Sequence, residues 1–220
     1  MEEYDVRFKV PFTCLLAGPT QSGKSTYVFN FMRLREQLMT VSTNNIIYFY
    51  KKWQSSFDIF KSEGIVTQWI NELPTLDRLE ELTYAYKDKG GSIVVIDDFM
   101  QQINIDISDL FTAMCHSHHI SVFLLSQNLF LQKPLYRNIS INSMYIIVLK
   151  NPRDASQIRS YAKQFAPGNT KWVVDVYREC TKKAYTYLLF DHHQTTPDIL
   201  RVRSNIFQFE WPLCVWVPKI

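Results

Sequence analysis

The chain reads Gly18-Pro19-Thr20-Gln21-Ser22-Gly23-Lys24-Ser25-Thr26 directly after an apolar run at 12–17 and before apolar residues at helical spacing in 24–39. This stretch contains the pattern G-x-x-x-x-G-K-[ST], which is typical of a nucleotide-binding loop between a strand and a helix N-terminus. Small residues let backbone N–H groups turn inward around a polyphosphate. We expect Lys24 to place its charge on the β- and γ-phosphates and the Ser25 hydroxyl to bind Mg²⁺. The alternative, an ordinary glycine-rich turn, is disfavoured by the strand and helix patterns on either side.

The composition is that of a globular protein with a large core. Of the 220 residues, 46% are hydrophobic and 15% aromatic, so the composition does not indicate disorder. The formal charge of +3 is too small to indicate nucleic-acid binding by itself, and any DNA contact would require local basic clusters. No apolar run approaches the roughly 20 residues of a membrane-spanning helix, so we expect no membrane span.

The cysteines and the amino-terminal residues favour a reducing, intracellular environment. The cysteines are scattered without paired spacing, at Cys14, Cys115, Cys180 and Cys214. The start, Met1–Asp5, is acidic and does not resemble a secretory signal. Cys115 and His119 have the i, i+4 spacing of one helix face, but no converging pair of ligands stands nearby, so we disfavour a metal site there.

Alternating strand and helix patterns predict an α/β three-layer domain. Apolar runs typical of buried parallel strands occupy 12–16, 45–50, 92–96, 121–125 and 144–149. Helical patterns occupy 24–39, 76–87, 108–118 and 153–165. A further strand is expected at 184–190, and a run rich in Phe, Trp and Pro at 207–217 predicts either an edge hairpin or an arm on a neighbouring subunit. We expect one domain over 1–220, with its core at about 10–190 and a C-terminal extension at 191–220.

Two carboxylates follow an apolar run in IVVIDD (Ile93–Asp98), a pattern typical of a Walker B segment. Asp97 would hold Mg²⁺ through a water opposite Ser25, and Asp98 would orient or deprotonate the attacking water. Strands often end in Asp at a turn, so the pattern alone is equally consistent with a capped turn. The position strengthens the assignment, because Lys24 and Asp97 are 97 − 24 = 73 residues apart with one predicted strand between them. This spacing is expected where an extra strand separates the two motifs in the sheet.

An amide follows the predicted strand at 121–125. Gln127 stands at its carboxyl end, which is the edge where ligands bind in open α/β sheets. There an amide can hydrogen-bond the γ-phosphate and the attacking water. Gln127 is therefore the candidate sensor, the residue that reports whether the bond to the γ-phosphate is intact. The alternative is an amide that only caps the following turn.

Phosphoryl transfer also uses a cation to stabilise the negative charge that develops in the transition state. Arg137, Arg153 and Arg159 follow the fourth predicted strand, and each is a candidate arginine finger, although a solvated surface arginine is the more common role. Short basic clusters at 150–153 and 182–183 would contact phosphates if they line a pore, although surface solvation is the default.

Six segments of the chain have the character of family motifs: GPTQSGKST (Gly18–Thr26), IIYFYKKWQ (Ile46–Gln54), IVVIDDFM (Ile93–Met100), ISVFLLSQNLF (Ile120–Phe130), LKNPRDASQI (Leu149–Ile158) and YLLFDHHQTTPDILRVRSNIF (Tyr187–Phe207). Together they resemble the packaging ATPases of Polinton and adintovirus-type elements, in the FtsK/HerA branch of P-loop motors, with poxvirus and virophage packaging enzymes as relatives. The resemblance spans about residues 12–207, and its later motifs are more specific than the phosphate-binding loop.

The resemblance implies a P-loop NTPase three-layer sandwich, with a mainly parallel sheet of the 5-1-4-3-2 type and added C-terminal strands. It implies a ring of identical subunits that uses ATP and Mg²⁺ to drive double-stranded viral DNA into a preformed capsid. The partners would then be duplex DNA and capsid vertex proteins, in the nucleus or cytoplasm of a host cell or associated with the virion.

The resemblance also carries over residue roles. Lys24 and Ser25 form its Walker A pair, Asp97 and Asp98 its Walker B pair, and Gln127 its strand-four sensor. The branch often has glutamate at the second Walker B position, so the shorter Asp98 would act through an intervening water. The match does not decide which arginine acts in trans, and Arg137 and Arg153 both stay candidates.

Other functions share the phosphate-binding loop. A small-molecule kinase would carry an Arg-rich lid, which the sequence lacks, and a GTPase would carry an N-K-x-D motif, which is also missing. An ATP-gated assembly scaffold would bind nucleotide without hydrolysing it, and Asp98 and Gln127 argue against that alternative.

Overall fold

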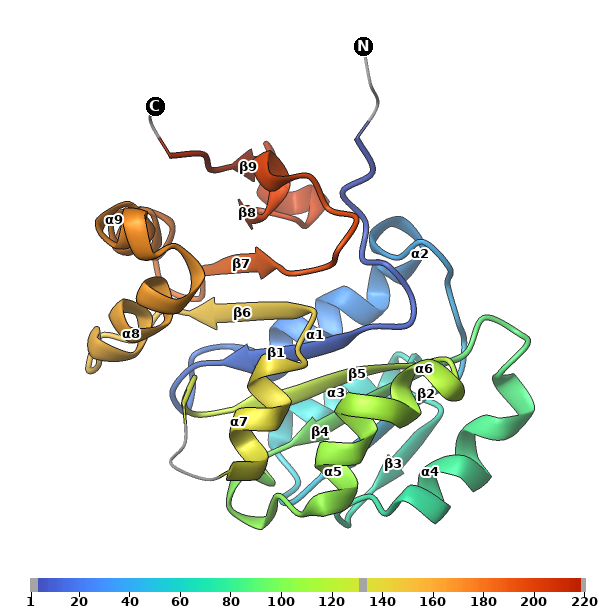
Figure 1. Cartoon of the computed structure of the whole chain (residues 1–220). Coiled ribbons are helices and arrows are strands. Elements are labelled where there is room, and N and C mark those ends of the chain that lie inside the picture. The colour runs from blue at the N-terminus through green and yellow to red at the C-terminus, as the bar shows by residue number, and fades with distance from the viewer. Residues whose placement is uncertain (1–3, 131–133, 219–220) are drawn as a thin grey trace.

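The computed structural model describes residues 4–130 and 134–218, so the first three residues of the acidic amino-terminal stretch lie outside it. Within the described residues, one nine-stranded sheet has helices on both faces (Figure 1). Its strands are β1 (Thr13–Ala17), β2 (Ile46–Tyr50), β3 (Gln68–Ile70), β4 (Ser92–Asp97), β5 (Ile120–Ser126), β6 (Tyr145–Leu149), β7 (Tyr187–Asp191), β8 (Val202–Ser204) and β9 (Cys214–Val215).

The helices divide between the two faces of the sheet. α1 and α3 contribute to one hydrophobic core, whereas α4, α5, α7, α8 and α9 contribute to the other. The helices are α1 (Lys24–Arg33), α2 (Arg35–Leu38), α3 (Ser55–Ser62), α4 (Leu76–Thr83), α5 (Ile105–Asp109), α6 (Cys115–Ser117), α7 (Pro134–Ile141), α8 (Ser156–Phe165) and α9 (Thr170–Cys180).

The strand order is β3-β2-β4-β5-β1-β6-β7-β8-β9. Pairing is parallel from β3 to β6 and antiparallel from β6 to β9. The five strands predicted from apolar runs therefore lie in the order β6-β1-β5-β4-β2, which is the 5-1-4-3-2 arrangement. The predicted three-layer sandwich with added C-terminal strands is confirmed.

The central strands are buried on both faces, as continuous apolar runs predict. Successive side chains of a strand point to opposite faces. In β1, Leu15 and Ala17 enter the core under α5 and α7, whereas Cys14 and Leu16 enter the core under α1. Hydrophobic burial on both faces thus fixes β1 in the middle of the sheet, and its carboxyl end leads into the glycine-containing loop at 18–23.

Several predicted helices differ in detail from those observed. The helix expected at 24–39 is divided at Leu34 into α1 and α2, and the one expected at 108–118 contains a π-helical turn between α5 and α6. The helix expected from Arg153 begins at Ser156, because Asn151 Oδ1 first accepts hydrogen bonds from the N–H groups of Arg153 and Asp154. These side-chain bonds turn the chain before the helix begins.

The C-terminal extension joins its own sheet. β8 pairs with β7, and β9 pairs with β8, which agrees with the edge hairpin rather than the arm on a neighbouring subunit. A buried ion pair between Arg203 of β8 and Asp191 of β7 links the extension to the core. Phe207 is 2% exposed and packs on Tyr27 of α1, with ring centroids 5.0 Å apart. The extension therefore lies against α1, the helix that follows the loop at 18–23.

Among the described residues, no helix combines the length and the apolar character needed to cross a bilayer.

Candidate active site

The loop between β1 and α1 has the backbone geometry that its glycines permit. Gly23 has φ 95°, in the left-handed region that favours glycine, and it immediately precedes α1. A Cβ at Gly18 would lie 2.6 Å from Ser22 Oγ and 3.0 Å from Leu149 Cβ, so no side chain fits there. The Gly18 N–H donates to the carbonyl of Ser126 at the end of β5 (3.0 Å). The loop is thereby fixed against the neighbouring strand.

Lys24 lies across this loop. Its Nζ donates to the carbonyl oxygens of Gly18 (2.7 Å) and Pro19 (3.0 Å). Burial lowers the pKa of Lys24, while the nearby carboxylates of Asp97 and Asp98 oppose that shift. A cation held over the loop by two carbonyls is in position for a polyphosphate, which would satisfy it more fully than the carbonyls do.

Ser25 and Asp97 meet at the start of α1. Ser25 Oγ donates to Asp97 Oδ2 at 3.0 Å, and the Tyr48 hydroxyl of β2 donates to the same oxygen at 2.7 Å. Asp97 is 4% exposed. Burial raises the pKa of Asp97, and the hydrogen bonds from Tyr48 and Ser25 and the charge of Lys24 partly offset this rise.

The donor set at this point suits a hard divalent cation. Mg²⁺ prefers oxygen ligands, and proteins commonly bind it through one or two carboxylates together with substrate phosphates. Ser25 Oγ and the Asp97 carboxylate supply such oxygens beside the loop. In residues 4–130 and 134–218, neither this point nor any other has a group of three or more His, Cys, Asp or Glu side chains placed to hold a metal ion. Cys115, considered above for a metal, is buried, and burial raises the pKa of its thiol to about 12.

Asp98 and Gln127 form a second pair at the carboxyl ends of β4 and β5. Gln127 Nε2 donates to Asp98 Oδ1 at 3.3 Å, and both side chains are exposed. Asp98 has φ 67°, a left-handed conformation that is uncommon outside glycine, asparagine and aspartate. This turn sends Asp98 away from the buried direction taken by Asp97. The two adjacent carboxylates therefore occupy different environments, one buried and one open to solvent.

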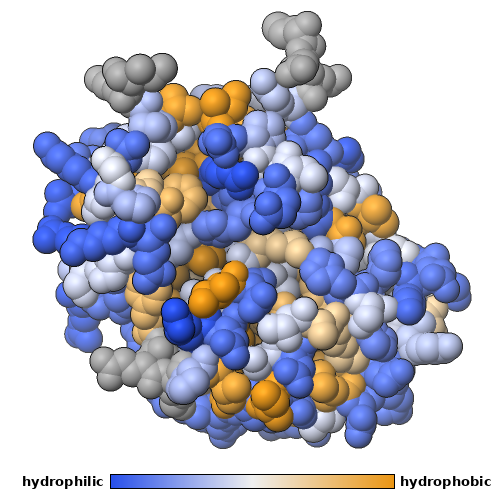
Figure 2. Space-filling model, in the orientation of Figure 1, coloured by the Kyte–Doolittle hydropathy of each residue, from blue (hydrophilic) through white to orange (hydrophobic). Residues whose placement is uncertain are grey.

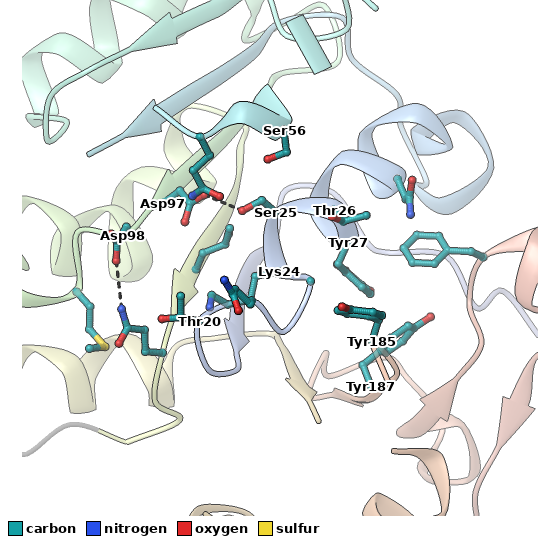
Figure 3. A pocket seen from close by; sticks show the side chains of 18 of the residues that line it. Thr20, Lys24, Ser25, Thr26, Tyr27, Ser56, Asp97, Asp98, Tyr185 and Tyr187 are labelled. Atoms are coloured by element: carbon teal, nitrogen blue, oxygen red, sulfur yellow. Dashed lines mark hydrogen bonds between the residues drawn. The ribbon is translucent and has the colours of Figure 1, made fainter. Parts of the chain in front are cut away.

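A single cavity of about 630 Å³ unites these groups (Figure 3). The predicted site residues that line it are Thr20, Gln21, Gly23, Lys24, Ser25, Thr26, Asp97, Asp98 and Gln127. The other residues of the predicted loop, Gly18, Pro19 and Ser22, do not line it. The close view shows Asp97 and Asp98 on one side of Lys24, and Tyr27, Tyr185 and Tyr187 on the other.

The candidate arginines lie outside this cavity. Arg137 is exposed on α7, and Arg153 is exposed in the loop between β6 and α8. Among the described residues that line the cavity there is no arginine. The assignment of either residue as an arginine finger stays a prediction about a neighbouring subunit.

Sequence reasoning missed Tyr48 and the aromatic residues of the cavity. A tyrosine within an otherwise apolar, buried strand is a usable signal, because a buried hydroxyl needs a hydrogen-bond partner. The identity of the partner is not visible locally, since Tyr48 and Asp97 are 49 residues apart in the chain. Tyr185 and Phe209 belong to no recognisable sequence motif. Only the arrangement of the C-terminal strands brings them to the cavity.

The fold is that of the P-loop NTPases. Solved structures of the genome packaging NTPase B204 from Sulfolobus turreted icosahedral virus 2 share it. The complex with ATP-gammaS matches with a TM-score of 0.55 and 16% identity, over 84% of this chain and 95% of that one. The complex with AMPPCP matches with a TM-score of 0.52 and 19% identity, over 88% and 96%. A scan against models of protein families gives no match, and a search of curated proteins gives none either.

Proposed function

We propose that this chain is a genome-packaging ATPase that hydrolyses ATP to drive double-stranded viral DNA into a preformed capsid. The observation that carries the proposal is the meeting of Lys24, the Ser25–Asp97 pair and the Asp98–Gln127 pair in one cavity. The shared fold with a genome packaging NTPase in complex with ATP-gammaS and AMPPCP supports it.

The loop binds the polyphosphate. Its backbone N–H groups and the N-terminus of α1 attract the phosphates, and Lys24 exchanges its carbonyl partners for the β- and γ-phosphate oxygens. Ser25 Oγ and, through a water, the Asp97 carboxylate would hold Mg²⁺, which would neutralise charge on those oxygens. Tyr48 keeps the Asp97 carboxylate oriented toward Ser25, and its hydrogen bond favours the ionised form that a cation requires.

Asp98 is the proposed general base. It shares a hydrogen bond with Gln127, so the two side chains reach the same space beyond the γ-phosphate. A water held there attacks the γ-phosphorus, its proton passes to Asp98, and the bond to the bridging oxygen breaks to give ADP and phosphate. Because aspartate is shorter than glutamate by one methylene, a further water bridges Asp98 to the attacking water.

A basic segment, residues 150–183 with α8 and α9 inside it, supports duplex DNA as the partner. It contains eight lysines and arginines against three acidic residues, a net charge of +5 in a chain whose total is +3. A hollow of about 300 Å³ on α8 and α9 is lined by four cations, Arg159, Lys163, Lys171 and Arg178, and by one acidic residue, Asp175. The surface over α8 and α9 is largely hydrophilic in Figure 2. Clustered cations contact phosphates without reading sequence, which suits a motor that moves any DNA.

The proposed motor is a ring, in which an arginine of one subunit stabilises the charge that develops in the site of the next. Arg137 and Arg153 are the candidates, since both are exposed and outside their own cavity. Capsid vertex proteins are the proposed docking partners, and the proposed location is the interior of the host cell or the virion.

Phosphate release from ATP, with and without duplex DNA, tests this function. The motor predicts turnover that DNA stimulates and that Lys24→Ala abolishes. Turnover that requires a small acceptor molecule would instead identify a kinase. Nucleotide binding with no turnover under either condition would identify an assembly scaffold. Either result would contradict the packaging proposal.

A further inference from the structure

The cavity extends well beyond the groups that the proposed hydrolysis uses. Its far end is lined by aromatic side chains and one carboxylate, namely Tyr27, Tyr185, Tyr187, Phe207, Phe209 and Glu210. Its volume of about 630 Å³ lies within the range of about 300–1,000 Å³ that holds whole small-molecule ligands. The cavity therefore has room for more than a triphosphate.

The acidic groups set the direction in which a nucleotide must lie. If Mg²⁺ and the attacking water are held at Asp97 and Asp98, the γ-phosphate points toward that side of Lys24. The rest of the nucleotide then extends to the opposite side, past Thr26. Figure 3 shows that Tyr185 and Tyr187 stand on this opposite side. The sugar and base are thus directed toward the aromatic end.

Tyr185 has an unusual backbone conformation. It lies in the turn between α9 and β7 with φ 63°, a left-handed conformation that is strained for a bulky residue. Tyr185 is 70% exposed, so burial of this residue offsets little of the strain. The ring lies against the phosphate-binding loop, because a Cβ at Gly23 would come within 3.2 Å of Tyr185 Cδ1.

Phe209 lies at the same end of the cavity and is held there by a second aromatic ring. The residue is 66% exposed, and its ring stacks on that of Phe207, with centroids 5.2 Å apart and an interplanar angle of 12°. Glu210 fixes this turn, since its Oε2 accepts hydrogen bonds from the Tyr187 hydroxyl (2.6 Å) and the Phe207 N–H (3.3 Å). Phe207 itself is anchored on Tyr27 of α1.

We propose that Tyr185 and Phe209 form the nucleobase-binding end of the site, where the exposed rings stack on the purine of the bound triphosphate. The inference rests on the proposed function, because it presupposes that the loop binds a nucleotide. It gives the C-terminal extension a role in substrate binding, since Phe209 reaches the cavity only through the turn after β8. A purine is favoured because it offers a larger stacking surface than a pyrimidine.

Binding of ATP and of inorganic tripolyphosphate, each with Mg²⁺, tests the proposal on the full chain. Tyr185→Asn removes the ring, and asparagine tolerates the left-handed backbone, so the variant should fold. We expect it to weaken ATP binding by about 5- to 150-fold, the usual effect of losing one stacked base. Binding of tripolyphosphate should be unchanged, and Tyr185→Phe should bind ATP like the unmodified protein.

Controls separate this proposal from the function on which it rests. Tyr84→Ala removes an equally exposed tyrosine (68%) that does not line the cavity, and it should leave binding of both ligands unchanged. Phe209→Ala should repeat the selective loss of ATP affinity. Equal binding of ATP and tripolyphosphate by the unmodified protein, or equal loss of both in Tyr185→Asn, would overturn the base-stacking proposal while leaving the phosphate site intact. No binding of either ligand would overturn the proposed function as well.

Discussion

At the scale of single residues, the site is organised around one buried carboxylate. Asp97 is nearly excluded from water, yet it accepts two hydrogen bonds at one oxygen and lies near Lys24. Burial disfavours its charge, whereas these neighbours favour it. Removing any one of them should therefore return Asp97 toward its protonated form, which binds a cation poorly.

Tyr48→Phe tests this balance. The variant removes a hydrogen bond that lowers the pKa of Asp97, so the already raised pKa should rise further. Because the ionised carboxylate is the form that would hold Mg²⁺ in the proposed site, the acidic limb of the kcat/KM profile should shift to higher pH. Phosphate release measured across pH gives the shift.

Tyr50→Phe is the matched control, since Tyr50 lies on the same strand and no hydrogen bond joins its hydroxyl to Asp97 among the described residues. Its profile should coincide with that of the unmodified protein. An acidic limb that stays in place in Tyr48→Phe, or moves to lower pH, would show that Tyr48 does not support the ionised carboxylate.

Residues within a contiguous motif were predictable, and residues joined only by the fold were not. Lys24 and Ser25 are defined by a local pattern, because the loop that positions them is itself local. Tyr48 and Tyr185 act through contacts with distant segments, which depend on sheet register and on a strained turn. No local pattern encodes either contact.

At the scale of elements, we predict that duplex DNA binds to the helix pair α8–α9. Lys163→Glu combined with Lys171→Glu reverses two charges beside the same hollow. The double variant should need about tenfold more duplex DNA for half-maximal stimulation, and this requirement should grow with salt concentration. Basal turnover should be unchanged, because neither lysine lines the nucleotide cavity. Titration of DNA against phosphate release measures the effect.

Lys87→Glu combined with Lys89→Glu is a control of equal charge in the turn that leads into β4. If both double variants lose stimulation equally, net charge rather than the α8–α9 surface decides the interaction.

The attachment of β8 to β7 carries a stability prediction. Arg203 and Asp191 form an ion pair whose side chains are 2% and 3% exposed. Arg203→Ala leaves a buried carboxylate uncompensated, so the free energy of unfolding should fall by about 3–5 kcal/mol in urea denaturation. Arg203→Met combined with Asp191→Leu removes both charges and should lose less than Arg203→Ala. A loss below about 1 kcal/mol in Arg203→Ala would show that the pair does not hold the extension.

Fully buried elements were predictable from sequence, whereas short or ambiguous ones were not. The parallel core strands are continuous apolar runs, which follow directly from burial on both faces. β3 has only three residues, none of them fully buried. α9 contains TKWVVDVYREC, whose valines favour a strand locally, and its helical form depends on packing against α8 and β7.

At the scale of the whole molecule, the C-terminal extension completes the proposed nucleotide cavity that the first strand and helix begin. β7 to β9 extend the sheet past β6 and bring Tyr185, Phe207, Phe209 and Glu210 to the cavity beside the loop at 18–25. Figure 1 shows the two ends of the described chain on the same side of the molecule. Nucleotide binding is therefore expected to stabilise the extension together with the core.

The central claim is that this cavity hydrolyses ATP with Asp98 as the base, and the Asp98→Asn variant tests it most directly. Asparagine keeps the size of the side chain and tolerates the left-handed backbone, so the cavity should keep its shape. Steady-state phosphate release should fall by about 100-fold or more, while ATP affinity measured on the same preparation stays within about threefold. Unchanged phosphate release by Asp98→Asn would contradict the account, because hydrolysis would then not depend on the carboxylate at this site.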